Sequence, residues 1–228
     1  MTDTTIDVFF TDTVLSRTPQ LADYFALLDK DEQQMASRFK FDELKQRYII
    51  CHGILRELLA TYVAEPAAQL RIVQAQYGKP YLADFPELSF NMSHTGDCLA
   101  IAIGQQCRLG VDIECYKVRN TWDGLVKKCF AQQEADYWYA LDTSVRGHAF
   151  YQFWVKKEAF VKAVGQGITL GLNQCVVNPN GFKTFLSVPE HCFAAAQWHI
   201  EALVLPDNIF GAVVCDSVMD LNFCTLSM

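Results

Sequence analysis

Gly110-Val111-Asp112-Ile113-Glu114 is the stretch of this sequence that decides the fold and the chemistry. Apolar and acidic side chains alternate in it, which is typical of a β-strand whose successive side chains point to opposite faces. Val111 and Ile113 are expected to point into a core, and Asp112 and Glu114 to share the other face. Two carboxylates held so close together repel each other and need a cation or a basic partner. The simpler alternative is an outward-facing pair on an edge strand.

A second segment, WVKKEAFVK at residues 154–162, supplies a third carboxylate, Glu158, and a base, Lys162. Their spacing of four places both on one face of a helix. Because the surrounding sequence is rich in aromatic residues, most of this helix must be buried and its charges confined to a narrow strip. Together with Asp112 and Glu114, Glu158 suits Mg²⁺, which binds a few carboxylates plus substrate phosphate oxygens. The alternative is a solvated helical ion pair, worth only a few tenths of a kcal/mol.

The composition allows a large core and argues against some functions. With 228 residues, of which 51% are hydrophobic and 13% aromatic, the chain can form one large domain or two lobes of about 110 residues each. The formal charge of −7 argues against a nucleic-acid binder, because affinity for a phosphate backbone depends on clustered Lys and Arg. Any basic site must be local, and residues 38–56 are the candidate.

The cysteines and the N-terminus indicate the compartment. Nine cysteines are an odd number, and no C-x-x-C pair suggests zinc, so we expect free thiols in a reducing cytosol. The first base, Arg17, follows three acidic residues, which is not the cationic start of a signal peptide. No apolar run approaches the roughly 18 residues of a membrane span. These features predict a soluble cytoplasmic protein without membrane contacts.

Periodicity and turn residues predict the order of the elements. Helices are expected before strands in both halves, which predicts an α+β fold of two similar lobes, 1–106 and 107–228, with the active site in the cleft between them. No residue-level repeat accompanies this order. The expected helices are 20–28, 47–63, 132–141 and 147–164; the expected strands are 6–10, 70–76, 89–92, 98–103, 107–114, 198–205 and 209–215.

Two predicted turns carry further candidate ligands. Ser93 and His94 lie in Phe90–Asp97, which offers hydroxyls, an imidazole and backbone amides that can cradle a phosphate; a polar hairpin with a structural histidine is the alternative. Gly78-Lys79-Pro80 is most simply a turn, although Lys79 can serve as a nucleotide or phosphate contact. The arginines of residues 38–56 are the weakest candidates individually, since surface arginines are common.

These motifs together resemble the 4'-phosphopantetheinyl transferase superfamily, in its longer two-lobed, surfactin-synthetase-activating type. The resemblance covers about residues 38–167 and depends most on the two acidic motifs and their separation. It implies a pseudo-twofold α+β fold. One departure is Ala131, where many relatives have a serine that caps the helix leading into Glu134.

The resemblance implies transfer of 4'-phosphopantetheine from coenzyme A to a serine of an apo acyl, peptidyl or aryl carrier protein, releasing adenosine 3',5'-bisphosphate. Glu158 is the expected base, directly or through a metal-bound water, and Lys162 stabilises the leaving phosphate. The implied magnesium ligands are Asp112, Glu114 and Glu158; the implied coenzyme A contacts are Arg38, Arg47, Lys79, Ser93, His94, Asp112 and Lys162.

Two other functions fit the same residues. One is a magnesium-dependent nucleotide pyrophosphatase, which needs no protein acceptor. The other is a non-catalytic module that binds coenzyme A or a carrier protein, although the presence of all three acids and Lys162 disfavours it. A monomer is expected, because the short trimeric synthases of the superfamily are about half this length. The pathway stays open among fatty acid, siderophore, polyketide and polyunsaturated lipid synthesis.

Overall fold

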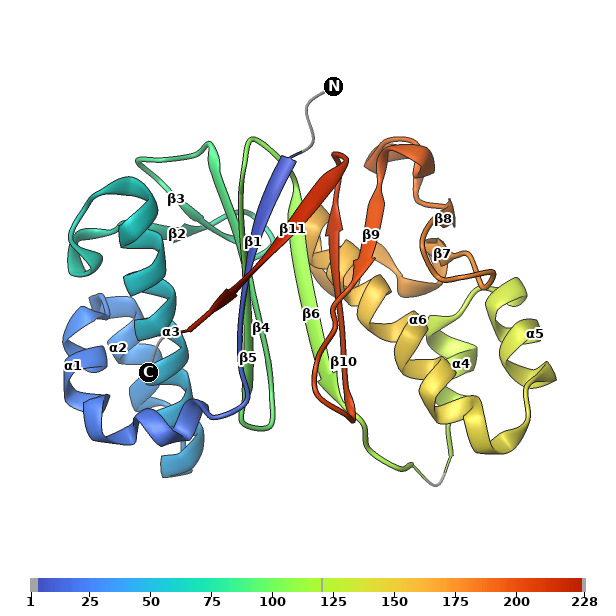
Figure 1. The fold of residues 1–228 in the computed structure, drawn as a ribbon, viewed down its shortest axis with the longest axis horizontal. Coiled ribbons are helices and arrows are strands. Elements are labelled where there is room, and N and C mark those ends of the chain that lie inside the picture. Colours follow the sequence, from blue (N-terminus) through green and yellow to red (C-terminus); the bar gives the residue numbers. More distant parts are fainter. Residues whose placement is uncertain (1–3, 120, 227–228) are drawn as a thin grey trace.

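The computed structural model describes residues 4–119 and 121–226 and shows helices outside two central sheets (Figure 1). The strands are β1 (Thr4–Thr11), β2 (Ile72–Gln74), β3 (Pro80–Leu82), β4 (Leu88–Thr95), β5 (Cys98–Gln105), β6 (Leu109–Cys115), β7 (Val176–Val177), β8 (Phe185–Ser187), β9 (His199–Ala202), β10 (Ile209–Cys215) and β11 (Met219–Thr225). The helices are α1 (Leu21–Leu27), α2 (Lys30–Ser37), α3 (Asp42–Val63), α4 (Asp123–Cys129), α5 (Gln132–Ala140) and α6 (Thr143–Val164).

Two sheets form the centre of the molecule. The first has the strand order β11-β1-β5-β4 and the second the order β6-β10-β9. An apolar cluster of alternating residues from β1, β5, β6 and β10 is buried between them, including Ile6, Val8, Ala100 and Val213. Burial of these faces stabilises the contact between the lobes through the hydrophobic effect.

Each sheet is covered on its outer face by a helix of 22 residues, α3 on the first and α6 on the second. Both helices end in a left-handed residue, Ala64 with φ 55° and Gly165 with φ 76°. Such a residue turns the chain out of a helix. The structure therefore confirms the mixed α+β fold of two helix-covered lobes. None of the helices in the described part of the chain is both long and apolar enough to cross a membrane.

The last strand departs from the expected division at residue 107. β11 pairs in parallel with β1, from Thr4 opposite Met219 to Phe10 opposite Thr225, so residues 219–225 lie in the sheet of the first lobe. Asn222 Nδ2 also donates to Asp7 Oδ1 at 2.7 Å. This pairing covers an edge of β1 that would otherwise expose unpaired backbone groups. The final strand of the expected second lobe, residues 107–228, thus belongs to the sheet of the first lobe.

Two short helices, α2 and α4, were not expected from the sequence. α2 begins at a capping box, in which Asp29 accepts from the backbone of Asp31 and Glu32, and Glu32 accepts from Asp29 N. This arrangement satisfies backbone donors that would otherwise be free at the start of the helix. The pattern Asp-x-x-Glu is visible in the sequence, but only eight residues follow it, too few for a clear periodic signal.

A row of side chains joins the two sheets where strands β4 and β6 run next to each other. We call Ser89, Asn91, Ser93 and Thr95 of β4 the β4 seam, because each hydrogen-bonds to the segment that contains β6. Their spacing of two places them on one face of the strand. β4 continues through Thr95, so Ser93 and His94 lie in a strand and not in the turn that the sequence predicts.

Candidate active site

Strand β6 has the orientation that the sequence predicts. Val111 and Ile113 are 0% and 1% exposed and belong to the cluster between the sheets. Asp112 points the other way, towards α6, and Glu114 shares its face with partial exposure. The alternation of apolar and acidic side chains therefore places two carboxylates under the helix that carries Glu158 and Lys162.

Gly110 allows α6 to lie directly on β6. A Cβ atom at Gly110 would lie 2.0 Å from Ala159 O and 2.5 Å from Ala163 N, far inside van der Waals contact. The helix presents small residues at these crossing points, so backbone meets backbone. This close approach brings the face of α6 that carries Glu158 and Lys162 over the acidic end of β6.

Lys162 and Asp112 join the two acidic motifs by an ion pair. Lys162 Nζ donates to Asp112 Oδ1 at 2.8 Å and to Val111 O at 3.1 Å. The Asp112 side chain is only 7% exposed, and the Lys162 side chain 28%. The second oxygen, Asp112 Oδ2, is buried and receives no hydrogen bond from the described residues. A buried acceptor without a donor is costly, and a cation would satisfy it.

All three carboxylates are held in an environment that favours protonation. Burial raises the pKa of Asp112, against the pull of Lys162 and Ser93. Burial and the charge of Asp112 raise the pKa of Glu114. Burial raises the pKa of Glu158 to about 7, with repulsion from Asp112 and Glu114 adding to the shift and Lys162 opposing it. The three groups therefore repel one another, and added positive charge would stabilise their ionised forms.

The donor set suits a hard divalent cation by its chemistry. It consists of carboxylate oxygens only, one of them without a partner, as Mg²⁺ prefers. Within residues 4–119 and 121–226, however, no three His, Cys, Asp or Glu side chains lie in an arrangement that holds a metal ion. The chemistry of these residues therefore suits the ion, whereas their positions in this structure do not form a three-ligand site.

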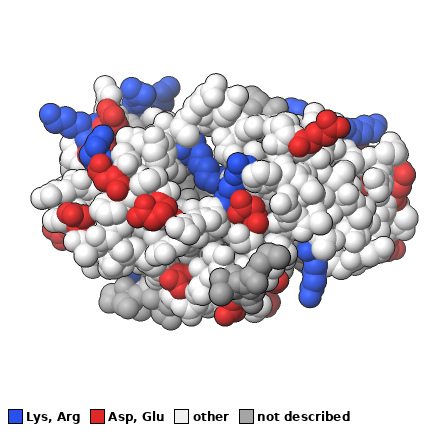
Figure 2. Space-filling view, turned by 90° about the horizontal axis from the view of Figure 1, so that it is seen from above, with Lys and Arg blue, Asp and Glu red and all other residues white. Residues whose placement is uncertain are grey.

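Two cavities open beside these groups. A cavity of about 200 Å³ is lined by Glu158 and Lys162 of α6, by the turn that contains Lys79, and by Asn91. A second cavity of about 660 Å³ lies in the first lobe and is lined partly by Arg38 and His52. The two share Pro80 and Asn91 and are therefore adjacent. Seen from above, basic side chains lie next to acidic ones at the middle of the molecule (Figure 2).

Lys79 connects the lobes in this structure. Its Nζ donates to Leu109 O at 2.9 Å and to Ala163 O at 2.8 Å, which ties the β2–β3 hairpin to β6 and to the last turn of α6. Burial lowers the pKa of Lys79 to about 8. The side chain lines the smaller cavity, so it remains close to any ligand there, but two of its three hydrogens serve the scaffold.

Ser93 and His94 point in different directions, as neighbours on a strand do. Ser93 is 5% exposed and donates to Asp112 Oδ1 at 2.9 Å. His94 is exposed. Desolvation, followed by the positive charges of Lys162 and Arg47, lowers its pKa. The structure thus places His94 in a basic field suited to an anion, and Ser93 inside the β4 seam.

The two predicted arginines lie on the first lobe. Arg38 is exposed at the larger cavity. Arg47 on α3 donates to Glu43 at 2.6 Å, and its Nε is buried without a hydrogen-bond partner among the described residues. An unsatisfied donor near His94 is a second sign of an anion site.

Other bases of the same motifs prove to be structural. Lys157 lies 2.6 Å from Glu134, and both side chains are 0% exposed. Glu134 Oε2 also accepts a hydrogen bond from Ala131 N. Because the alanine side chain has no hydroxyl that could accept a bond in return, only half of a capping box forms. Arg56 is likewise 0% exposed and pairs with Asp29 and Glu32. In the sequence, the apolar residues on either side of these charged residues indicate that they are buried.

The fold and the site define a class of two-lobed α+β protein in which acidic and basic side chains meet beside two cavities. Comparison with known families agrees: residues 16–106 match the family "4'-phosphopantetheinyl transferase, N-terminal", and residues 108–214 match the "4'-phosphopantetheinyl transferase superfamily".

Three relatives support the same assignment. A putative 4'-phosphopantetheinyl transferase of Synechocystis is 35% identical over 71% of this chain and 67% of its own length. The 4'-phosphopantetheinyl transferase HetI of Nostoc is 31% identical over 85% and 81%, respectively. Sfp of Bacillus subtilis is 27% identical over 66% of each chain. This chain belongs to the 4'-phosphopantetheinyl transferase superfamily, whose activity is the transfer of phosphopantetheine to carrier proteins.

Proposed function

We propose that this chain transfers 4'-phosphopantetheine from coenzyme A to a serine hydroxyl of an apo carrier protein, in a magnesium-dependent reaction. The observation that carries the proposal is the 2.8 Å contact between Lys162 Nζ and Asp112 Oδ1. It joins two residues, on a strand and on a helix, that lie 50 positions apart in the sequence. Glu158, on the same helix, lies close enough to Asp112 for this carboxylate to raise its pKa. Family membership supports the transferase activity.

The residues divide into groups that bind and groups that move a proton. Glu158, with a pKa near 7, accepts the proton of the carrier serine, whose oxygen then forms a bond to the phosphorus on the pantetheine side of the diphosphate. The bond between that phosphorus and the bridging oxygen breaks, and adenosine 3',5'-bisphosphate leaves with the electron pair. Lys162, which lines the smaller cavity with Glu158, would lie beside the leaving phosphate and stabilise its charge.

Asp112, Glu114 and Glu158 would hold the magnesium ion, through the unpartnered Asp112 Oδ2 among other oxygens. When bound, the ion neutralises the diphosphate and makes the phosphorus more electrophilic. Lys162 donates to Asp112 Oδ1 and leaves Asp112 Oδ2 available for the ion. Because Ser93 donates to the same Asp112 oxygen, we assign this serine to orienting the carboxylate.

The first lobe would contribute the nucleotide contacts. Arg38 lines the larger cavity, and Arg47, His94 and Lys162 form the basic field between the lobes. Lys79 holds the hairpin beside the smaller cavity while one ammonium hydrogen remains for a ligand. Residues 1–106 would thus bind the nucleotide, and the segment that begins at residue 107 would supply the metal ligands and the base.

The assay is mass spectrometry of an apo carrier protein after incubation with coenzyme A and MgCl₂. Transfer adds about 340 Da to the carrier, the mass of the phosphopantetheine group. The matched control is Glu158→Gln, which keeps the shape of the side chain and removes both the base and one carboxylate ligand of the magnesium ion. No mass gain on any of several carriers from different pathways would contradict the proposal.

The pyrophosphatase and the non-catalytic module receive no support from the relatives, which are named as transferases. We further propose that the protein acts as a cytoplasmic monomer without nucleic-acid or membrane partners. The formal charge of −7 supports the absence of nucleic-acid partners, and the nine free thiols support a reducing compartment. The carrier assay also identifies the pathway, among nonribosomal peptide, polyketide, siderophore, fatty acid and polyunsaturated lipid synthesis.

A further inference from the structure

The β4 seam repeats one hydrogen-bonding pattern along its length. Three of its four side chains accept hydrogen bonds from backbone N–H groups of β6 and so replace the main-chain bonds that would join two strands of one sheet. The accepting contacts are Asn91 Oδ1 from Val111 N at 2.8 Å, Ser93 Oγ from Ile113 N at 3.2 Å, and Thr95 Oγ1 from Cys115 N at 3.2 Å. At the far end Ser89 Oγ donates to Cys107 O at 2.5 Å.

Two members of the β4 seam also donate a hydrogen bond to a carboxylate, whereas the other two do not. Ser93 Oγ donates to Asp112 Oδ1 at 2.9 Å, and Thr95 Oγ1 donates to Glu114 Oε2 at 3.2 Å. Each hydroxyl thus accepts from one β6 residue and donates to the carboxylate of the residue before it. Each hydroxyl has a single hydrogen to donate and is itself anchored to the β6 backbone, so the carboxylate that accepts this hydrogen is held relative to the backbone register.

We infer that Thr95 is a positioning residue for Glu114, which it holds in the orientation that binds a divalent cation next to Asp112. The inference rests on the proposed function. Asp112 repels Glu114, and the Glu114 side chain is long and partly exposed, so without a donor it would turn away from the centre.

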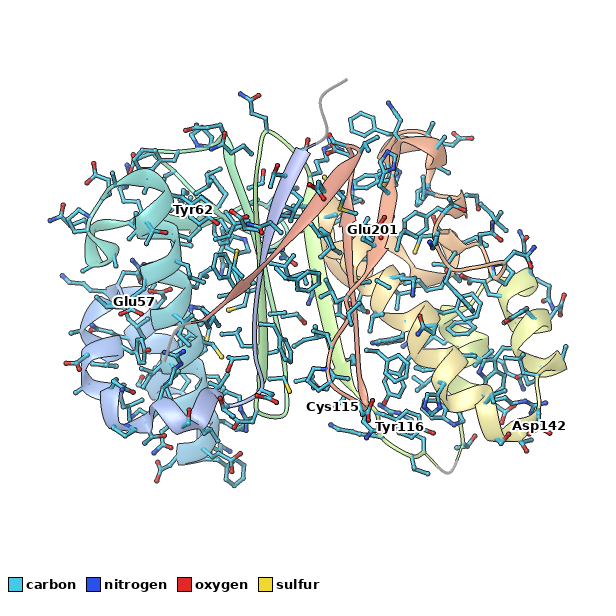
Figure 3. All side chains as sticks on the ribbon, viewed as in Figure 1. Glu57, Tyr62, Cys115, Tyr116, Asp142 and Glu201 are labelled. Carbon is cyan, nitrogen blue, oxygen red and sulfur yellow. The ribbon has the colours of Figure 1, made fainter. Side chains whose placement is uncertain are left out.

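The surroundings of Thr95 favour this role. Its side chain is buried at 7% exposure, so water does not compete for the hydroxyl. The neighbouring Cys115 and Tyr116 mark the end of β6, where the chain leaves the sheet (Figure 3). The indole of Trp154 on α6 lowers the pKa of Glu114, against the effect of burial. The hydroxyl of Thr95 donates directly to Glu114 Oε2.

The test compares three variants of the full chain in the binding of Mn²⁺, an oxygen-preferring substitute for Mg²⁺, by calorimetry without coenzyme A or carrier. Thr95→Val keeps the side-chain volume and removes both hydrogen bonds, and we expect affinity to fall about tenfold, as for other groups that orient metal ligands. Thr95→Ser keeps the hydroxyl and should stay within about twofold of wild type. Ser89→Ala is the matched control, since it removes a seam bond that touches no carboxylate.

Thermal unfolding of each variant separates positioning from stability. If Thr95→Val and Ser89→Ala lose stability alike but only Thr95→Val loses affinity, the inference holds. Equal affinity of Thr95→Val and wild type would overturn it, as would an equal loss in both variants. The binding assay needs no acceptor, so a wild type that binds Mn²⁺ but transfers nothing refutes the proposed function alone. If the wild type binds no Mn²⁺, the inference is wrong. The proposed transferase activity is then tested separately, by the mass gain of the carrier protein.

Discussion

Replacing Gly110 by alanine should separate the two halves of the active site. The new Cβ would lie 2.0 Å from Ala159 O, while ordinary contact begins at 3.4 Å, so α6 must retreat from β6 by about 1.4 Å at this point. Both obstructing groups belong to the helix backbone and cannot rotate away. We expect the free energy of unfolding to fall by about 3 kcal/mol or more, the upper end for overpacking.

The same displacement should impair catalysis beyond the loss of stability. A retreat of α6 lengthens the 2.8 Å contact between Lys162 and Asp112, and displacements of about 1 Å in positioning groups can reduce rates about 100-fold. The measurements are urea unfolding and the rate of carrier modification at a temperature where the variant is folded. The matched control is Gly124→Ala on α4, where an added Cβ meets nothing within 4 Å and alanine should gain up to about 1 kcal/mol. Wild-type stability and rate in Gly110→Ala would refute the reasoning that this glycine sets the site.

Three further predictions concern titratable groups. Carrier modification at saturating Mg²⁺ should increase as pH rises through the pKa of Glu158, which the bound cation moves below the value of about 7 that this group has without metal. Glu158→Gln removes this limb together with one metal ligand, and an unchanged pH–rate profile of its residual activity would exclude Glu158 as the base. Burial lowers the pKa of Lys156 from 10.5 to about 8, so the unfolded state holds the extra proton between these values and this side chain by itself adds about 3 kcal/mol to the rise in stability across this window. In urea unfolding, Lys156→Met should be more stable at pH 7 and lose this contribution, whereas that of Lys79 stays; a curve parallel to that of the wild type would contradict this. Lys157→Met should lower the free energy of unfolding by about 3–5 kcal/mol, because it leaves the buried Glu134 carboxylate without its cation. Adding Glu134→Leu should recover most of that loss in urea unfolding. Additive losses in the double variant would contradict the pairing.

Much of the fold could be predicted because its signals are local. The alternation in β6, the hairpin of β9 and β10, and the long helices of both lobes follow from the periodicity of apolar residues. Strand β11 could not be assigned in this way, because its partner is the first strand of the chain. α2 and α4, at eight and seven residues, are too short for periodicity to be decisive.

The candidate site was predictable in part for a related reason. The sequence singles out Asp112, Glu158 and Lys162 by residue type and spacing, and the structure brings Lys162 onto Asp112. The sequence does not distinguish a lysine that faces a ligand from a lysine that stabilises the fold. Lys79 bonds to two backbone carbonyls, and Lys157 forms a buried ion pair. Nothing in their own spacing separates these lysines from Lys162.

By itself, the sequence determined which side chains alternate along β6, which charges share a face of α6, and the family to which the chain belongs. These properties depend on residues within a few positions of one another, where backbone geometry dictates direction. Only the tertiary structure decided that α6 crosses β6 at Gly110, that the β4 seam orients Asp112 and Glu114, and that Asp112 Oδ2 has no donor among the described residues. Such contacts arise when segments far apart in the chain pack together, because burial and hydrogen-bond satisfaction are properties of the assembled core.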